Sequence, residues 1–504
     1  MHSIVDKSRK GTFFVLIGQI GSRAIGLLTI VVLARFLSVS HFGVYNVITG
    51  FILVFSLVTS FGLGSSLQRF LPEYEKKEEW KRLFNTFFFS QGFRAVSGLI
   101  AIVLATISFD LFAPFFKIQQ YWIPFVLFCI GSYAFFQIEF LQIAFNSIFL
   151  HFYTAIGSLF YLGLRLVLIT CLLYMGYGLI GAFYADIIAY LIGCLLLWFL
   201  FFSKVYVKEK EWFEDTAAGI EWKRLLSFSL YSSATIPAGI ILSQAMDVYV
   251  VAAMSTMNQV GIYALGSRAS KMLLSIMPQN VLQSVIRPTF FQRYYSVKEK
   301  NVELNLMFRS LVIMNAAFLF PILALAGVQA EGILTVIFEA KFAESTTIFL
   351  IFLVFNAFTI FELPSDLVLQ SIEKLHVRLY AAMFAAIYNL IAAILLMPKY
   401  GIMGVAFATG SAAMGKCVFF YVMASKYTGI SFQWRGLFKI IVNTSIAATL
   451  TYLVGLLGNT NLWMFFSLIV GTCAYIGMFL MNNCLDVRDR ELVNRFCKRR
   501  IFNV

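Results

Sequence analysis

Six basic side chains interrupt stretches of sequence that are otherwise as apolar as lipid chains. They are Arg23, Arg94, Arg165, Arg268, Lys271 and Lys416. A charge at the centre of a membrane helix costs about 2.5–3.5 kcal/mol on insertion scales, so such a residue usually faces a wet, protein-lined interior. The six positions therefore predict an internal cavity and suggest an anionic ligand.

The stretches that carry these residues have the composition of membrane helices. Apolar residues make up 60% of the 504 residues and charged residues 13%, with a mean hydropathy of +0.83, which excludes an ordinary soluble protein. A helix of about 20 residues crosses roughly 30 Å of hydrocarbon. Fourteen such spans are predicted, at residues 11–35, 43–63, 84–107, 122–145, 149–174, 179–203, 225–250, 259–283, 304–328, 346–370, 376–397, 400–424, 436–457 and 462–483. We therefore expect an all-α polytopic membrane protein with 14 transmembrane helices.

The charges between the spans predict the orientation. One set of loops, together with both termini, carries 28 Lys and Arg residues, and the opposite set carries four. Under the positive-inside rule this asymmetry places both termini in the cytoplasm. The net charge of +14 is then explained by loops beside anionic lipid headgroups rather than by nucleic acid. The acidic and basic segment at residues 72–80, PEYEKKEEW, is interpreted as a solvated helical loop.

Residues that build metal, cofactor or disulfide sites are sparse. Five of the seven cysteines fall within predicted spans, and the four histidines form no cluster or metal-binding motif. We expect reduced cysteines, no metal and no cofactor.

The chain carries an internal repeat, a recurring plan for transporters. Gly43 and Tyr45 match Gly261 and Tyr263 at a shift of 218 residues, and YGLIG at 177–181 matches YGIMG at 400–404 at a shift of 223. Similar shifts along the chain predict a tandem duplication. The expected architecture is two pseudo-symmetric six-helix lobes plus two C-terminal helices, divided at residues 1–222, 223–430 and 431–504.

Five acidic residues within the spans nearly balance the six cations. They are Glu139, Asp186, Asp247, Glu362 and Asp366. In the first lobe, Arg23, Arg94 and Arg165 lie near the middle of spans one, three and five. The planar arginine fork suits a diphosphate, and pairing with Glu139 or Asp186 is the structural alternative.

In the second lobe Arg268 and Lys271 are three residues apart, so they share one helical face. Their anionic partner is either Asp247 or a substrate. We therefore group these two residues with the three arginines of the first lobe as candidate substrate contacts.

Glu362 and Asp366 flank Pro364 on span ten, and the proline frees a backbone carbonyl. The two carboxylates are candidates for a cation or proton site, as is Asp247, or for a salt bridge with Lys416. Glu139 is likewise a candidate for an ion site or for a salt bridge. Pro237 in span seven, like Pro364, is either a hinge or a packed kink.

Four motifs carry a family resemblance over essentially the whole chain. They are LARFLSVSHFGVY at 33–45, FGLGSSLQRFLPEY at 61–74, VGIYAL at 260–265 and MPKYGIMGVAFAT at 397–409. With them the chain resembles the MOP superfamily and, within it, polysaccharide and lipid-linked oligosaccharide flippases of the Wzx type. The resemblance implies transport without chemistry of an undecaprenyl-diphosphate-linked oligosaccharide, such as an O-antigen unit, across a bacterial plasma membrane. It implies a monomeric transport unit beside other polysaccharide assembly proteins, and it transfers no binding site.

These observations lead to an alternating-access hypothesis, in which the two lobes rock about a central cavity. One rival is a MATE-like, ion-coupled antiporter of small molecules, which the five acidic residues support. A second rival is a polytopic glycosyltransferase or ligase, which needs a larger outer loop than the chain offers. A third is a non-transporting scaffold in which all buried charges are paired.

Overall fold

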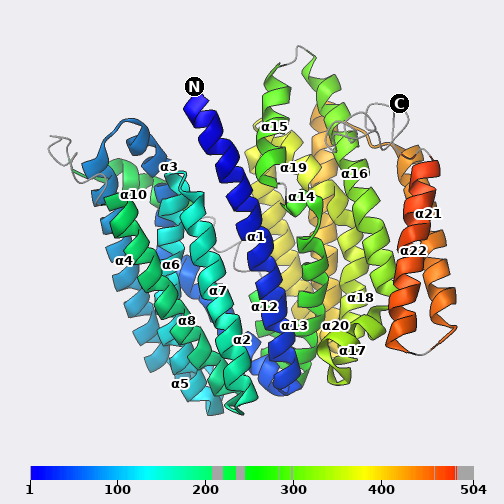
Figure 1. Ribbon diagram of the computed structural model, residues 1–504, viewed down its shortest axis with the longest axis horizontal. Helices are drawn as coiled ribbons and strands as arrows, with labels where there is room; N and C mark the ends of the chain where they lie inside the picture. The colour runs from blue at the N-terminus through cyan, green and yellow to red at the C-terminus, as the bar shows by residue number, and fades with distance from the viewer. Residues whose placement is uncertain are drawn as a thin grey trace. The chain divides into compact units, whose positions relative to one another are not determined.

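The fold is all-helical within the residues that the structure describes. The computed structural model describes residues 2–206, 219–233, 244–281, 283–296, 299–458, 460–482 and 484, with side chains from residue 18 onward. Among these residues there is no strand, and eleven helical segments are long and apolar enough to cross a membrane (Figure 1). The prediction of an all-α polytopic membrane protein is confirmed. The count of 14 spans stays a prediction.

The chain forms two compact units, residues 1–264 and 265–504. The predicted lobe boundaries at 222 and 430 come from the repeat rather than from compactness, and they stay a prediction. The elements of unit 1 are α1 (His2–Phe36), α2 (Val39–Ser60), α3 (Leu63–Lys76), α4 (Trp80–Ile107), α5 (Phe109–Phe112), η1 (Gln119–Tyr121), α6 (Trp122–Ser147), α7 (His151–Tyr174), α8 (Gly178–Phe201), η2 (Phe202–Tyr206), α10 (Trp222–Ser233) and α12 (Gln244–Met254).

Helix α6 is the centre of unit 1. It packs against α8, α4, α3 and α2, while α7 lies between α1 and α8. The end of this bundle formed by the start of α4 and the ends of α6 and α8 is filled by large aromatic side chains that are almost fully buried, including Phe84, Phe87, Phe140, Phe145 and Phe201. These rings stabilise the packing of α4, α6 and α8, because each aromatic side chain buries about 150–250 Å² of surface.

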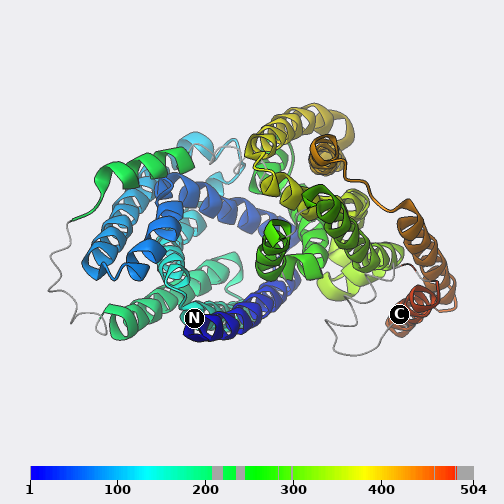
Figure 2. The ribbon, with the colours of Figure 1, turned by 90° about the horizontal axis from the view of Figure 1, so that it is seen from above.

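Unit 2 is built from the remaining helices. Its elements are α13 (Met257–Ser275, which crosses the boundary between the units), α14 (Pro278–Val281), α15 (Gln283–Ser296), α16 (Lys300–Val328), α17 (Ala330–Phe338), η4 (Ala340–Phe342), α18 (Ser345–Asn356), η5 (Ala357–Phe361), α19 (Glu362–Ser371), α20 (Leu375–Thr428), α21 (Trp434–Gly455) and α22 (Asn461–Met481). Helices α21 and α22 pack together at the edge of this unit, and α21 contacts α16 (Figure 2).

Predicted spans eleven and twelve follow each other without a loop as α20. The helix is sharply broken at Gly401, where the backbone is not helical. Gly401 has φ 57°, and Gly178, its match at a shift of 223, has φ 54° at the start of α8. Left-handed backbone favours glycine at both turns. The two matched glycines therefore share a left-handed backbone conformation.

Predicted spans seven and eight are not among the eleven apolar segments. Span seven, including Pro237, lies partly outside the described residues, and α10 and α12 are its described ends. Span eight corresponds to α13, which carries Arg268 and Lys271 together with several small polar residues.

Span ten is interrupted, as Pro364 predicted. Helix α18 ends at Asn356, a 3₁₀ segment follows, and Pro364 is the buried third residue of α19. The proline cannot donate to the carbonyl four residues earlier, that of Ile360, and this carbonyl instead accepts from Asn315 Nδ2 at 3.4 Å. A hinge role for Pro364 stays a prediction.

The matched glycines Gly43 and Gly261 make one reciprocal backbone contact within unit 1. A Cβ on Gly43 would lie 2.2 Å from the Met257 carbonyl oxygen, and a Cβ on Gly261 would lie 2.1 Å from the Val39 carbonyl oxygen. Val39 and Met257 are themselves related by the 218-residue shift. The contact therefore joins equivalent positions of the predicted repeat.

We predict that Gly43→Ala and Gly261→Ala each lower stability, because the added methyl group meets backbone rather than a flexible side chain. Overpacking of this kind typically costs about 1–3 kcal/mol, which corresponds to a fall of several degrees in the apparent melting temperature. The measurement is thermal unfolding of the purified protein in detergent. Gly92→Ala on α4 is the control, since a Cβ there meets nothing within 4 Å; equal melting of all three variants would contradict the prediction.

Candidate functional site

Arg94, in the middle of α4, is fully buried in unit 1. Its Nη1 donates to the Ser56 carbonyl oxygen and to Thr59 Oγ1 at 2.8 Å, both on α2. Its Nη2 donates to Ser56 Oγ at 2.9 Å and to Glu139 Oε2, on α6, at 2.7 Å. The guanidinium therefore joins three helices, and the predicted structural alternative, a pair with Glu139, is the observed arrangement.

The two members of this pair differ in exposure. The Arg94 side chain is 0% exposed, and the rings of Phe136 and Phe140 lie 4.7 and 5.0 Å from its Cζ. The Glu139 side chain is 38% exposed. A ligand reaching this place therefore meets the carboxylate, and the arginine acts behind it by fixing and neutralising Glu139.

Arg165 on α7 belongs to a second closed arrangement. Its Nε donates to Asp186 Oδ1 at 2.6 Å and its Nη2 donates to the Tyr45 hydroxyl at 2.5 Å, while that hydroxyl donates to Asp186 Oδ2 at 3.1 Å. Asp186 is buried on α8 and Tyr45 is buried on α2. The triad ties α2, α7 and α8 together at mid-depth.

The second copy of the repeat carries a neutral pair in the matching places. Asn389 and Thr409 correspond to Arg165 and Asp186 at shifts of 224 and 223, and Thr409 Oγ1 donates to Asn389 Oδ1 at 3.0 Å. The same pair of helices is thus held by an ion pair in one copy and by a neutral hydrogen bond in the other.

Lys416 pairs with Glu362 in unit 2. The Nζ atom lies 2.6 Å from Glu362 Oε1, and the Glu362 side chain is 40% exposed. Glu362 matches Glu139 at a shift of 223. Each copy of the repeat therefore holds a partly exposed glutamate against a more buried cation, although the cation comes from α4 in the first copy and from α20 in the second.

Asp366 has different partners from those the sequence suggested. Its carboxylate pairs with Arg378 at the start of α20 and with Arg287 Nη2 of α15 at 3.3 Å, and Gln370 Nε2 donates to it at 2.6 Å. Arg287 lies beyond the end of predicted span eight, and Arg378 lies in the first turn of predicted span eleven. Of its two predicted partners, Glu362 and Asp366, Lys416 forms an ion pair with Glu362.

The remaining predicted residues differ in accessibility. Arg23 on α1 and Arg268 on α13 are half-buried, Lys271 is exposed, and Asp247 is buried on α12. Arg268 and Lys271 lie on one helix, three residues apart, as predicted. In the described part of the chain, no three Asp, Glu, His or Cys side chains are grouped closely enough to hold a metal ion.

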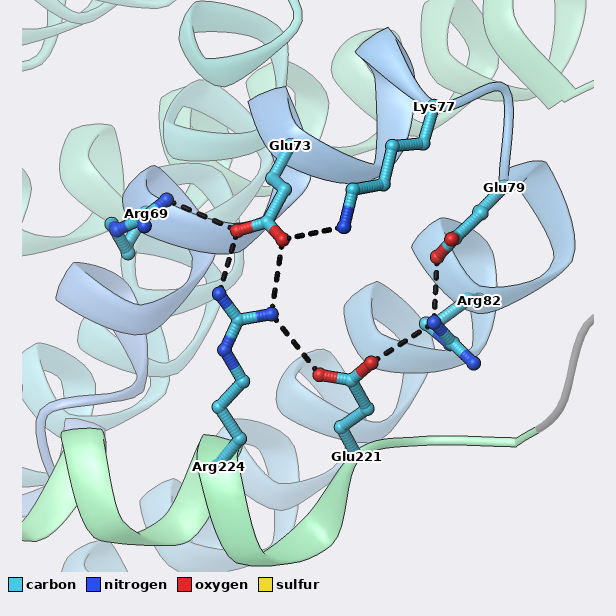
Figure 3. A network of polar contacts seen from close by, with 7 residues as sticks. All are labelled: Arg69, Glu73, Lys77, Glu79, Arg82, Glu221 and Arg224. Atoms are coloured by element: carbon cyan, nitrogen blue, oxygen red, sulfur yellow. Dashed lines mark hydrogen bonds and ion pairs between the residues drawn. The ribbon is translucent and has the colours of Figure 1, made fainter.

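A charged network outside the predicted spans was missed from the sequence. Figure 3 shows its members in unit 1, which are Arg69, Glu73, Lys77, Glu79, Arg82, Glu221 and Arg224. Arg224 of α10 donates to both Glu73 oxygens, at 2.7 and 3.0 Å, and to Glu221 at 3.1 Å, while Arg82 pairs with Glu221 at 2.9 Å. The spacing of Arg69, Glu73 and Lys77 indicates a charged helix face, but nothing in the sequence indicates the contact with α10.

This network shifts the acidity of its central carboxyl group. Hydrogen bonds from Arg224 and then from Lys77 lower the pKa of Glu73 from 4.5 to about 2. The same contacts with Glu73 and Glu221 raise the pKa of Arg224. A lowered carboxyl pKa stabilises the folded protein above the unfolded value of 4.5, and this stabilisation is lost as the pH falls from there toward 2.

Comparison with known proteins assigns the fold. A family model described as polysaccharide biosynthesis protein matches residues 8–294. The structure titled lipid II flippase MurJ, inward closed conformation, is 17% identical with a TM-score of 0.74 and covers 95% of this chain and 100% of its own. An inward-facing multidrug resistance MATE family transporter of the MOP superfamily is 14% identical with a TM-score of 0.64, covering 81% of this chain and 94% of its own.

A MOP superfamily transporter from Pyrococcus furiosus is 14% identical with a TM-score of 0.51 and covers 83% of this chain and 94% of its own. Among curated protein sequences none matches significantly. The family model confirms the predicted likeness to polysaccharide biosynthesis proteins, and the solved structures show that the chain has the fold shared by MurJ and MATE family transporters.

The neutral pair of the second copy provides a test of the Arg165 triad. We predict that Arg165→Asn or Asp186→Thr alone strongly destabilises the protein, because each leaves a buried charge without its partner, a loss of about 3–5 kcal/mol. The double variant, which copies Asn389 and Thr409, should recover much of the loss. Thermal unfolding of the four proteins measures the coupling; additive losses would contradict a paired arrangement.

The Glu73 network provides a test by pH. Glu73→Gln should lower the apparent melting temperature slightly at pH 7, since exposed pairs contribute only about 0–1 kcal/mol. The difference from wild type should shrink as the pH falls from about 4.5 toward 2, because protonation removes the carboxylate from both states. Glu344→Gln, outside the network, is the control; a difference independent of pH would contradict the assignment.

Proposed function

Since the chain belongs to the polysaccharide biosynthesis protein family, we propose that it flips an undecaprenyl-diphosphate-linked oligosaccharide from the inner to the outer leaflet of a bacterial plasma membrane. The observation that carries the proposal is the likeness over 95% of the chain to a lipid II flippase, together with the family match. Both termini lie in the cytoplasm, the transport unit is a monomer, and no covalent step is involved.

The cationic residues with accessible side chains are the proposed diphosphate contacts. Arg23 and Arg268 are half-buried and Lys271 is exposed, whereas Arg94 is fully enclosed. Arginine binds phosphate oxygens through paired hydrogen bonds and stays charged at physiological pH. These residues therefore replace Arg94, which is enclosed, and Arg165, whose guanidinium is held by Asp186 and Tyr45, as the anion-binding candidates. Arg94 and Arg165 serve as positioning residues.

Alternating access is the proposed mechanism. The nearest atoms in the contacts of Gly43 with Met257 and of Gly261 with Val39 are backbone carbonyl oxygens, and one side-chain carbon of Val39 lies beside them. A crossing made mainly through backbone atoms separates and re-forms with little rotamer cost, which suits a transporter that changes between two states. Coupling to a proton or sodium ion would use Asp247, Glu362, Asp366 or Glu139, in competition with cations such as Lys416.

The second candidate is an ion-coupled antiporter of small molecules. It is favoured by the likeness to MATE family transporters and by the acidic residues within the spans. The lipid-linked cargo is preferred because the flippase structure is matched with the higher TM-score and over more of the chain.

We predict that Arg23→Ala and Arg268→Ala each reduce flipping at least tenfold while the protein remains folded in the membrane. The assay follows fluorescent undecaprenyl-diphosphate-linked oligosaccharide across proteoliposomes containing the purified protein. Arg435→Ala is the control, because this exposed arginine lies on α21 rather than in either lobe. Wild-type protein that transports a cationic drug and leaves the lipid-linked saccharide in place would overturn the proposed function.

A further inference from the structure

One face of the C-terminal half of α6 is polar and accessible, although the segment Gln119–Ser147 that contains α6 is the most buried of the apolar segments in the described chain. Between residues 139 and 147 the accessible positions are Glu139, Gln142, Ile143 and Asn146. They are three or four residues apart, so they lie on one side of the helix. We call Glu139, Gln142 and Asn146 the α6 polar face; at 1.5 Å per residue it extends about 10 Å along the helix.

Polar groups of α7 continue this face. Gln142 Nε2 donates to Ser158 Oγ at 2.9 Å, and Asn146 Oδ1 lies 3.0 Å from His151 Nδ1. Lipid-exposed helix faces are apolar, since hydrocarbon offers no partner for carboxylates and amides. The α6 polar face and its α7 neighbours therefore line a wet region of unit 1.

The carboxylate of this face is held in a fixed orientation. Glu139 Oε2 accepts from both Arg94 Nη2 and Ser56 Oγ, at 2.7 and 2.6 Å, while the side chain stays 38% exposed. The positive charge of Arg94 is enclosed behind it. A ligand approaching this face thus meets carboxylate and amide oxygens, an amide donor, a hydroxyl and an imidazole. None of the side chains that supply these groups is a lysine or an arginine; they are Glu139, Gln142, Asn146, Ser158 and His151.

We propose that the α6 polar face binds hydroxyl groups of the lipid-linked glycan. The inference rests on the proposed function and names the part of the cargo that this face recognises. Sugar hydroxyls donate and accept hydrogen bonds, and a fixed carboxylate with neighbouring amides satisfies them. A diphosphate is disfavoured here, because Glu139 carries the same sign of charge.

The second copy of the repeat has a different character at matching positions. Glu362, Asp366 and Gln370 correspond to Glu139, Gln142 and Asn146 at shifts of 223, 224 and 224. There Asp366 is paired with Arg287 and Arg378, whose side chains are 32% and 40% exposed. Accessible arginines beside the matching carboxylate suit an anion, whereas the α6 polar face and its α7 neighbours include no arginine, so the recognition of uncharged hydroxyls is assigned to the α6 polar face.

Binding to three lipid probes tests the inference. The probes are undecaprenyl diphosphate, the same lipid with one N-acetylhexosamine, and the same lipid with a tetrasaccharide, each titrated into the purified full-length protein. Wild type should bind the tetrasaccharide lipid at least tenfold more tightly than the sugar-free lipid. The double variant Gln142→Ala/Asn146→Ala, which leaves the Arg94–Glu139 pair in place, should lose most of this preference and keep its affinity for the sugar-free lipid.

Further variants separate the possible outcomes. Glu139→Gln should also lose the preference, and Glu331→Gln, an exposed carboxylate on α17, should retain it. Equal affinity of wild type for all three probes overturns the inference, as does an unchanged preference in the double variant. A flipping rate that depends on a proton or sodium gradient in wild type and loses that dependence in Glu139→Gln, with the sugar preference intact, identifies an ion site instead. Failure of wild type to bind any of the lipids refutes the proposed function itself.

Discussion

The cost of a charge in hydrocarbon is the constraint on which helix packing in both units depends. An ionised side chain at mid-span is stable only beside an opposite charge or water, so each one selects a neighbouring helix. Arg94 fixes α4 against α2 and α6, Arg165 fixes α7 against α8 and α2, and Lys416 fixes α20 against α19. Apolar packing alone discriminates weakly between lipid and protein surfaces, since lipid tails are as apolar as leucine.

The two copies of the repeat meet this constraint with different residues. The glutamate at the matching position is kept, as Glu139 and Glu362, and both are about two-fifths exposed. The cation that pairs with this glutamate lies on α4 in the first copy and on α20 in the second. The Arg165–Asp186 pair has a neutral counterpart in Asn389 and Thr409, so a hydrogen bond links the matching positions in both copies while only one copy uses charges. The duplicated scaffold is thus constant, and its electrostatics are specific to each copy.

Sequence periodicity predicts which residues lie within a span but not which helix lies opposite them. The glycine matches, the break near Pro364 and the possible pairing of Arg94 with Glu139 could all be predicted, because each depends on local spacing or on a short set of alternatives. The partners of Asp366 could not, since Arg287 lies outside the predicted spans and Arg378 lies at the very start of one, so neither stands out as a buried cation. The contact of Glu73 with Arg224 joins residues 151 positions apart, and its formation depends on where α10 packs.

A lipid-linked glycan places two opposed demands on a transporter. The diphosphate requires accessible cations, whereas sugar hydroxyls are best matched by carboxylate and amide oxygens, and a carboxylate close to the phosphate-binding cations would neutralise them. In the proposed transport cycle these demands fall on separate helices, with arginines on α1 and α13 for the diphosphate and the α6 polar face for the glycan. Enclosing Arg94 behind Glu139 serves this division, because the arginine keeps the carboxylate ionised and oriented without offering the cargo a second cation.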